Sequence, residues 1–493
     1  SFYCNPFCPH CCKMSKPTLV CAMFNLERPV RYISTRGIAP ELDFDDVLIT
    51  GLARDGGLYV PKEWPRFSKA EIDSMKSLTY SELAVKIMKP FIGDNIPADD
   101  FIALVHETYS RFQHSAIAPL KQLENNLWLL ELFHGPTLAF KDYAMQILGG
   151  LFDEALRRRG KRTTIVGATS GDTGSAAIEA CRNRNSIDIF ILFPKGRVSS
   201  IQQRQMTTVD APNVHTIALE GTFDDCQDMV KSLFNDLEYR DKYNLSAVNS
   251  INWARLLPQI IYYFWAALAV GAPDRKVAFS VPSGNFGNIF SAYAAESLGL
   301  PIEKLIVATN KNDILSRFFN SGTMEIREVQ PSLSPSMDIQ VSSNFERLLF
   351  DLCNRDGSVT KGILDDFRSK GTFDIKMDIL NRSAEMFSAV GVDDKATLDR
   401  IQTTYRSTGE ILDPHSAVGL EAAHQARSYG SLSPELPIIS LACAHPAKFP
   451  DPVKEATGSY PILPAQLVDL LEQPEKITVL PNDFKTVSNY IAD

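Results

Sequence analysis

The stretch ELFHGPTLAFKDYAMQ, residues 131–146, places a lysine between two apolar segments. Residues 127–133 are typical of a buried strand, and apolar side chains recur at helical spacing over residues 144–152. Lys141 is therefore predicted to lie where a strand passes into a helix. Apolar neighbours and a helix N-terminus would lower the pKa of its ammonium group. A lysine that is partly neutral can form a Schiff base with a carbonyl compound, whereas the alternative is a surface lysine whose stem covers apolar residues.

Short apolar runs alternate with helical patterns along much of the chain. The runs are residues 163–168, 187–193, 277–281, 305–308 and 438–442. This alternation predicts parallel βαβ units and an α/β fold with open sheets, which bind ligands beyond the carboxyl ends of their strands.

Two other regions differ from this pattern. Residues 29–111 have mixed helical patterns and are predicted to form a separate N-terminal domain. Residues 311–345 have few periodic signals, as is common for functional or mobile segments.

The composition is that of a globular protein. The chain has 493 residues, of which 44% are hydrophobic and 22% charged, so two or three domains are expected. The net charge of −9 and the lack of a basic run argue against nucleic acid as a partner, although a local patch could still bind a small anion. The longest apolar run, Ile260 to Val270, is too short for a membrane span, and no membrane partner is predicted.

The cysteines are concentrated near the start of the sequence. Five of the nine lie in the first 21 residues: Cys4, Cys8, Cys11, Cys12 and Cys21. They could be drawn as a metal knuckle with His10, but no second C-x2-C pair follows, so no metal site is predicted. Residues 1–28 are interpreted as a leader of unknown origin. The remaining cysteines are scattered singly, which favours a reducing, cytoplasmic location.

Two glycine-containing loops follow predicted strands. They are ATSGDTG, residues 168–174, and SGNFGN, residues 283–288. Small side chains let backbone N–H groups approach an anion, and a helix start favours negative charge. Either loop alone could be an ordinary turn, but two in one α/β domain suggest two anions, a phosphate and a carboxylate.

Several motifs in order resemble those of threonine synthases. These are HGPTLAFKD (134–142), ATSGDTG, NSINWARLLPQ (249–259), SVPSGNFGN (280–288) and AHPAKFP (444–450). RYISTRGIAP and LARDGGLYVP in the N-terminal region resemble the longer microbial branch, so the resemblance runs from about Arg31 to the C-terminal region. It implies an α/β enzyme of fold type II that uses pyridoxal 5'-phosphate. The implied domains are 29–111 (N-terminal), 112–135 with 265–493 (large) and 136–264 (small).

The resemblance also assigns roles to residues. Lys141, preceded by Phe140, would be the catalytic lysine that carries the cofactor. The cofactor phosphate would be held by Ser283, Gly284, Asn285, Phe286, Gly287 and Asn288. The substrate carboxylate and cofactor ring would meet Thr169, Ser170, Gly171, Asp172 and Thr173. The substrate phosphate would be bound by Asn249, Asn252 and Arg255. On charge and position alone, Lys195 and Arg204 are further candidates for this phosphate, or else part of a solvated basic surface.

One position departs from the family pattern. A threonine is expected where this chain has Cys443, and a side chain there is expected to face the pyridine nitrogen of the cofactor. A thiol is a weaker hydrogen-bond partner than a hydroxyl, so the departure concerns cofactor tuning rather than the type of reaction. The side chains of His134, His415 and His445 are predicted to be structural rather than catalytic.

The implied reaction converts O-phospho-L-homoserine and water to L-threonine and phosphate, by γ-elimination and β-addition of water. Three alternatives stay open at this point. A phospho-lyase would release 2-oxobutyrate, a dehydratase would have no use for a phosphate site, and an inactive protein could have kept the fold without the cofactor. A monomer or a homodimer is expected.

Overall fold

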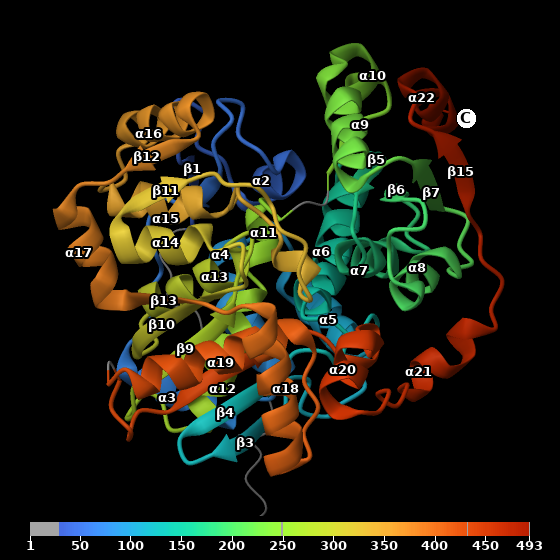
Figure 1. Cartoon of the computed structure of the whole chain (residues 1–493). Coiled ribbons are helices and arrows are strands. Elements are labelled where there is room, and N and C mark those ends of the chain that lie inside the picture. The colour runs from blue at the N-terminus through green and yellow to red at the C-terminus, as the bar shows by residue number, and fades with distance from the viewer. Residues whose placement is uncertain (1–28, 248–249, 431, 493) are drawn as a thin grey trace, which may run out of the picture.

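The computed structural model describes residues 29–247, 250–430 and 432–492 (Figure 1). The predicted leader, residues 1–28, and the predicted site residue Asn249 lie outside these ranges. Two mostly parallel sheets organise the chain, as the alternation of strands and helices predicted.

The larger sheet has six strands in the order β13-β10-β9-β14-β4-β3. Their bounds are β13 Phe387–Gly391, β10 Ile302–Thr309, β9 Val277–Pro282, β14 Ile438–Ala442, β4 Leu127–Glu131 and β3 Leu120–Glu124. Only β3 runs antiparallel to its neighbour. Helices α18 (Asp394–Thr408) and α19 (Pro414–Ser428) lie on one side of this sheet, and α12 (Gln259–Ala269) and α13 (Gly287–Ser297) on the other.

The second sheet has five parallel strands in the order β15-β7-β6-β5-β8. Their bounds are β15 Thr478–Pro481, β7 Val214–Glu220, β6 Ile187–Pro194, β5 Thr163–Ala168 and β8 Leu245–Ser246. One face packs on α9 (Phe223–Asn235) and α22 (Phe484–Ala492), and the other on α6 (Lys141–Arg158) and α7 (Asp172–Cys181).

The position of β15 differs from the predicted domain boundary. Residues 265–493 were assigned to the domain of the larger sheet, yet β15 pairs with β7 of the second sheet. The chain reaches it after α20 (Pro450–Thr457) and α21 (Ala465–Val468), along the right edge of Figure 1. The short run of residues 478–481 completes an edge that β7 alone would leave unpaired.

The N-terminal region combines a small antiparallel pair with helices. Its elements are β1 (Tyr32–Ser34), α2 (Phe44–Thr50), β2 (Tyr59–Pro61), α3 (Lys69–Ser74), α4 (Tyr80–Ile92) and α5 (Ala98–Ser110). Local sequence fixes helix starts here: in α4, Thr79 accepts from the N–H of Glu82, whose carboxylate accepts from the N–H of Thr79. The apolar side chains of this region share one core with α6, α12 and α13.

Further elements complete the described chain. They are α8 (Ser200–Thr207), α10 (Leu237–Lys242), α11 (Trp253–Leu256), α14 (Ile314–Ser321), β11 (Thr323–Glu325), α15 (Phe345–Leu352), α16 (Gly357–Lys370), β12 (Thr372–Asp374) and α17 (Met377–Met386), with 3-10 turns at Met75–Ser77, Pro335–Met337, Pro446–Lys448 and Asp469–Leu471.

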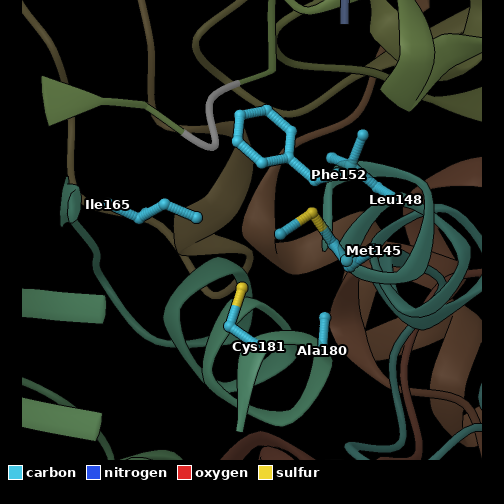
Figure 2. A pocket seen from close by; sticks show the side chains of 7 residues that line it. Met145, Leu148, Phe152, Ile165, Ala180 and Cys181 are labelled. Atoms are coloured by element: carbon cyan, nitrogen blue, oxygen red, sulfur yellow. The ribbon is translucent and has the colours of Figure 1, made fainter. Parts of the chain in front are cut away.

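Helices α6 and α7 pack very closely beside the second sheet. A Cβ atom at Gly149 would lie 2.4 Å from the carbonyl oxygen of Ala180, so this contact requires glycine. Figure 2 shows the small apolar pocket next to it, where Met145, Phe152 and Cys181 meet. The contact fixes the helix that begins with Lys141 against the second sheet.

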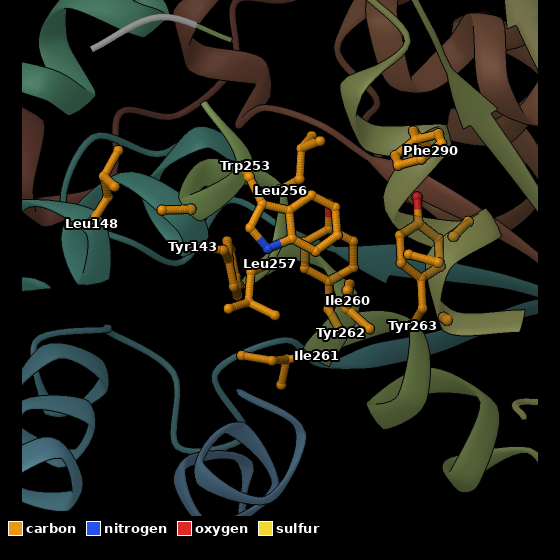
Figure 3. Close-up of a cluster of buried hydrophobic side chains, with 14 of the residues drawn as sticks. Tyr143, Leu148, Trp253, Leu256, Leu257, Ile260, Ile261, Tyr262, Tyr263 and Phe290 are labelled. Carbon is orange, nitrogen blue, oxygen red and sulfur yellow. The ribbon is translucent and has the colours of Figure 1, made fainter. Parts of the chain in front are cut away.

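Aromatic side chains fill the core between α6, α11, α12 and α13. Figure 3 shows Trp253, Tyr262 and Tyr263 within this cluster, and all three are buried. Among the described residues, no helix is both long and apolar enough to cross a membrane.

Candidate active site

The turn that carries Lys141 is tied to the end of strand β14. The N–H of Phe140 donates to the carbonyl oxygen of Cys443 at 2.8 Å, and the N–H of His445 donates to the carbonyl oxygen of Leu138 at 3.0 Å. Helix α6 then begins at Lys141 itself, so the lysine lies near a strand-to-helix junction, as predicted from the sequence. The carboxyl ends of β4 and β14 therefore meet at the lysine.

Lys141 combines partial burial with a free amine. Its Nζ makes no hydrogen bond or ion pair with any residue in the described parts of the chain. Burial lowers its pKa to about 8; the charge of Asp172 opposes this shift, and the charges of Arg255 and Lys448 add to it. Near neutral pH about one tenth of the amine is therefore unprotonated, far more than for an ordinary lysine, which favours a nucleophilic role.

The loop after β9 presents several unpaired donors. The Ser283 hydroxyl and the Asn288 amide nitrogen are buried without a partner in the described chain. The backbone N–H groups of residues 284–287 also donate to no described acceptor. Buried polar groups are normally paired, so this concentration of free donors at the start of α13 indicates an anion site.

The backbone of this loop is held in an unusual shape. A Cβ at Gly284 would lie 3.0 Å from the carbonyl oxygen of Ser336, so a side chain there would press on backbone. Phe286 adopts the left-handed conformation, with φ of 61°, at the residue before α13. Its ring packs against Phe319 and Phe345, which holds a conformation that non-glycine residues rarely adopt.

Side chains from elsewhere support the loop. Ser342 donates to the carbonyl oxygen of Gly284 at 2.7 Å, and both the backbone and the side-chain amide of Asn344 donate to the carbonyl oxygen of Asn285 at 3.0 Å. Sequence reasoning did not single out Ser342 or Asn344, although both lie in the stretch 311–345 that it marked as functional or mobile.

Asn288 is oriented by two tyrosines of α12. The hydroxyls of Tyr262 and Tyr263 donate to Asn288 Oδ1 at 2.5 and 2.7 Å. With its oxygen occupied in this way, the amide nitrogen of Asn288 is left as the free group. In the sequence the two tyrosines stand out only as part of the apolar run Ile260 to Val270.

The loop after β5 has both free and occupied side chains. Thr169 Oγ1 accepts from the N–H groups of Gly171 and Gly174 at 3.0 and 2.9 Å, which shapes the turn. The hydroxyls of Ser170, which is exposed, and Thr173, which is half-buried, have no partner among the described residues. These two hydroxyls are side-chain groups of the loop that remain available to a ligand.

Asp172 was predicted to contact the substrate, but protein groups occupy one of its carboxylate oxygens. Oδ1 accepts from Lys448 Nζ at 2.6 Å and from Gln202 Nε2 at 2.8 Å. Burial alone would raise the pKa of Asp172; the charges of Lys448 and Lys141 outweigh burial and hold the pKa well below its usual range. Asp172 is therefore ionised at neutral pH and lies close enough to Lys141 to affect it.

The segment before α11 contains one free and one occupied side chain. Asn252 was predicted to bind the substrate phosphate, yet Oδ1 accepts from the N–H of Ala254 at 3.0 Å and Nδ2 donates to the carbonyl oxygen of Leu48 at 2.8 Å. These bonds cap α11 and attach it to the N-terminal region. Arg255 is only 6% exposed, and its guanidinium pairs with no described residue. Burial lowers the pKa of Arg255 to about 10, as expected for a cation that lacks its counter-ion.

The two further cations already have partners. Lys195 is exposed and forms an ion pair with Glu220 at 3.0 Å. Arg204 donates to the carbonyl oxygen of Gln473 at 3.1 Å and lies 3.7 Å from Glu475. Neither has the free, buried charge that Arg255 has, so of the three cations Arg255 is best suited to an anion.

Cys443 is buried at the end of β14, beside the Lys141 turn. Its sulfur makes only a long contact with the carbonyl oxygen of Leu441, at 3.9 Å. Its N–H donates to Ser416 Oγ at 2.8 Å. Burial raises the pKa of the Cys443 thiol well above its usual value, so the side chain presents a neutral group.

The histidines that flank the site have structural partners. His134 Nε2 lies 2.6 Å from Glu131, and His415 Nδ1 lies 2.9 Å from Asp413. His445 Nδ1 accepts from the N–H of Ala447 at 3.1 Å, and burial lowers the pKa of His445 to about 4. Each of the three therefore has a partner within the protein, and the absence of a base role for them stays a prediction.

Three family models match the chain in succession. Residues 31–109 match the threonine synthase N terminus, residues 112–366 the pyridoxal-phosphate dependent enzymes, and residues 416–491 the threonine synthase C-terminal family. A threonine synthase of Pseudomonas aeruginosa is 54% identical over 94% of this chain and 98% of its own length. The chain belongs to the threonine synthase family.

Solved structures of threonine synthases have the same fold. The PLP-bound enzyme of Brucella melitensis, 53% identical, superposes with a TM-score of 0.91 over 94% of this chain and 98% of its own. The Escherichia coli enzyme, 32% identical, superposes with a TM-score of 0.78 over 94% of this chain and 99% of its own. The resemblance in the motifs is confirmed by these matches, as are fold type II and pyridoxal phosphate as the cofactor.

Proposed function

We propose that this threonine synthase family member converts O-phospho-L-homoserine and water to L-threonine and phosphate. The observation that carries the proposal is that the Lys141 amine and three sets of polar groups are left without a partner in the described chain. These are the donors of residues 283–288, the hydroxyls of the loop 169–173, and the guanidinium of Arg255. A substrate with both a carboxylate and a phosphate needs two anion sites in addition to that for the cofactor phosphate.

The residues present fit pyridoxal phosphate. The Ser283 hydroxyl, the Asn288 amide nitrogen and the N–H groups of residues 284–287 would hold its phosphate, since the two buried side-chain groups and these N–H groups have no described protein partner. Lys141 would carry the cofactor covalently, and the thiol of Cys443 would lie near the pyridine nitrogen. When bound, the cofactor withdraws electrons from the substrate carbons and so makes their C–H bonds acidic.

Arg255 would bind the phosphate group of the substrate. Its guanidinium is buried, and a dianion supplies the counter-charge that the described protein lacks. Ser170 and Thr173 would donate to the α-carboxylate. With both ends held, the α-, β- and γ-carbons have a fixed orientation relative to Lys141.

Lys141 would move the protons. With a pKa of about 8 its amine exists in both forms at neutral pH, so it can take a proton from the α-carbon and transfer protons at the β-carbon. Phosphate leaves from the γ-carbon and water adds at the β-carbon. No histidine is required, because His134, His415 and His445 are held by structural contacts.

A product assay tests the proposal. The purified protein and a Lys141→Ala variant are incubated with pyridoxal phosphate and O-phospho-L-homoserine, and threonine, 2-oxobutyrate and phosphate are quantified. Equal amounts of threonine and phosphate, absent with the variant, are expected. Equimolar 2-oxobutyrate without threonine would instead identify a phospho-lyase. Formation of neither product would contradict the substrate assignment.

We also infer a monomer or a homodimer in the cytoplasm. Sedimentation velocity of the full chain distinguishes the two assembly states. Fractionation of the native cells tests the compartment.

A further inference from the structure

Lys448 is a buried cation that no step of the proposed reaction uses. It ends the 3-10 turn Pro446–Lys448, which follows β14 of the larger sheet, and its side chain has no exposed surface. Nζ lies 2.6 Å from Asp172 Oδ1 and donates to the carbonyl oxygen of Thr137 at 2.7 Å. Lys448 thus joins the larger sheet to the loop after β5 and to the turn before Lys141.

The ion pair of Lys448 with Asp172 affects how the loop 169–173 can bind an anionic ligand. Asp172 lies between Ser170 and Thr173, the two residues with free hydroxyls, and an uncompensated carboxylate there would repel the carboxylate of an amino acid. Lys448 supplies the opposite charge at hydrogen-bond distance, and Gln202 supplies a neutral donor. The pair as a whole carries no net charge, so the loop can accept an anion.

Lys448 also acts on Lys141 by two routes, through Asp172 and through Thr137. On one side it compensates Asp172, whose charge by itself favours the ammonium form of Lys141. On the other side, Thr137, whose carbonyl accepts from Lys448, donates its N–H and hydroxyl to Asp142 at 2.8 Å each. Asp142 follows Lys141 directly, so a displacement of Thr137 would be transmitted to the start of α6.

We propose that Lys448 is a positioning residue that neutralises Asp172 and holds the loop 169–173 against the Lys141 turn, so that the loop can bind an α-carboxylate. The identity of the substrate rests on the proposed function. The effect of Lys448 on Asp172 and Lys141 does not, because it follows from contacts within the protein.

The test uses charge removal and its compensation. Lys448→Met removes the cation and keeps most of the apolar stem, Lys448→Arg keeps a cation, and the double variant Asp172→Asn with Lys448→Met removes both charges. Lys454→Met in α20 is the control, since the Lys454 side chain lies over the ring of Tyr460. Two quantities are measured. The first is KM, together with kcat, for O-phospho-L-homoserine in the enzyme loaded with pyridoxal phosphate. The second is the pH midpoint of Lys141 acylation in the cofactor-free protein, and mass spectrometry measures the extent of acylation.

Lys448→Met is expected to raise KM by about tenfold or more through carboxylate repulsion, and to move the acylation midpoint to higher pH. The double variant should recover both values in part, and Lys448→Arg should stay closer to the wild type than Lys448→Met. If Lys448→Met alone fails to fold, recovery of folding in the double variant is the expected result.

An acylation midpoint and KM that are the same in Lys448→Met and the double variant would overturn the proposal, as would failure of both to fold. If the wild type makes no threonine, the proposed reaction fails. The acylation midpoints then still decide whether Lys448 acts on Lys141 through Asp172.

Discussion

Arg347 Nε donates a hydrogen bond to the carbonyl oxygen of Tyr59 at 3.0 Å, which connects the N-terminal region to the active site. The Arg347 side chain is completely buried and also donates to the carbonyl oxygen of Ile251 and to Asn344 Oδ1. Asn344 in turn donates to Asn285 in the proposed phosphate loop. A single buried guanidinium therefore ties residues 29–111 to two segments of the site.

Replacement of Arg347 by methionine should weaken both folding and cofactor binding. It leaves the backbone oxygens of Tyr59 and Ile251 and Oδ1 of Asn344 without this donor, and we expect the free energy of unfolding to fall by about 3–5 kcal/mol. Urea unfolding of the cofactor-free protein measures this, and fluorescence titration measures the affinity for pyridoxal phosphate. Arg327→Met, which removes an exposed partner of Glu325, serves as the control. If Arg347→Met and Arg327→Met had the same free energy of unfolding, the proposed structural role of Arg347 would be contradicted.

Ser283 and Ser280 provide a matched pair of buried hydroxyls. Ser283 has no described partner, whereas Ser280 Oγ donates to the carbonyl oxygen of Gly419 at 2.6 Å. Ser283→Ala should leave unfolding of the cofactor-free protein unchanged and weaken cofactor affinity about 10- to 100-fold, the usual effect of one hydrogen bond to an anion. Ser280→Ala should lower stability by about 1 kcal/mol and leave the affinity unchanged. If Ser283→Ala lowered stability without weakening cofactor affinity, while Ser280→Ala weakened the affinity, Ser283 would be excluded from the phosphate site.

The strands that the sequence predicted are those with continuous apolar runs. Residues 163–168 and 438–442 were predicted as strands and form β5 and β14 with these bounds. Residues 478–481 form β15, which could not be found in the same way because its side chains alternate between half-buried and exposed. Edge strands are less buried than central ones and so have weaker apolar signals.

The site was predictable where motifs are continuous, and much less so where side chains meet across the fold. The motif around Lys141 and the loop 283–288 were identified from local sequence, and each carries polar groups without a partner in the described chain. The partners of Asp172 and Asn252 were not predictable, since Lys448 and Leu48 are more than two hundred residues away in sequence. The same holds for Asn344, which reaches Asn285 from a stretch without clear periodicity.

Replacement of Arg255 by methionine should separate catalysis from stability. Loss of the proposed phosphate ligand is expected to lower kcat/KM about 100- to 1000-fold. Removal of a buried cation that has no described counter-ion should leave the cofactor-free protein at least as stable as the wild type. Steady-state kinetics and thermal unfolding measure the two effects. Lys195→Met is the control, because Lys195 pairs with Glu220 at the surface. Unchanged kcat/KM in Arg255→Met would rule out its proposed role.

The lowered pKa of Lys141 predicts how cofactor uptake and stability depend on pH. Attachment of the cofactor needs the neutral amine, so its rate in the cofactor-free protein should rise with pH and level off above about 8. Between about 8 and the ordinary value of 10.5, the unfolded chain binds more protons than the folded one at this residue, so folding stability should increase with pH relative to Lys141→Met. The relative gain is at most about 3 kcal/mol. Stopped-flow absorbance and urea unfolding measure the two quantities. A rate of attachment that is still rising steeply above pH 10 would mean that Lys141 has an ordinary pKa.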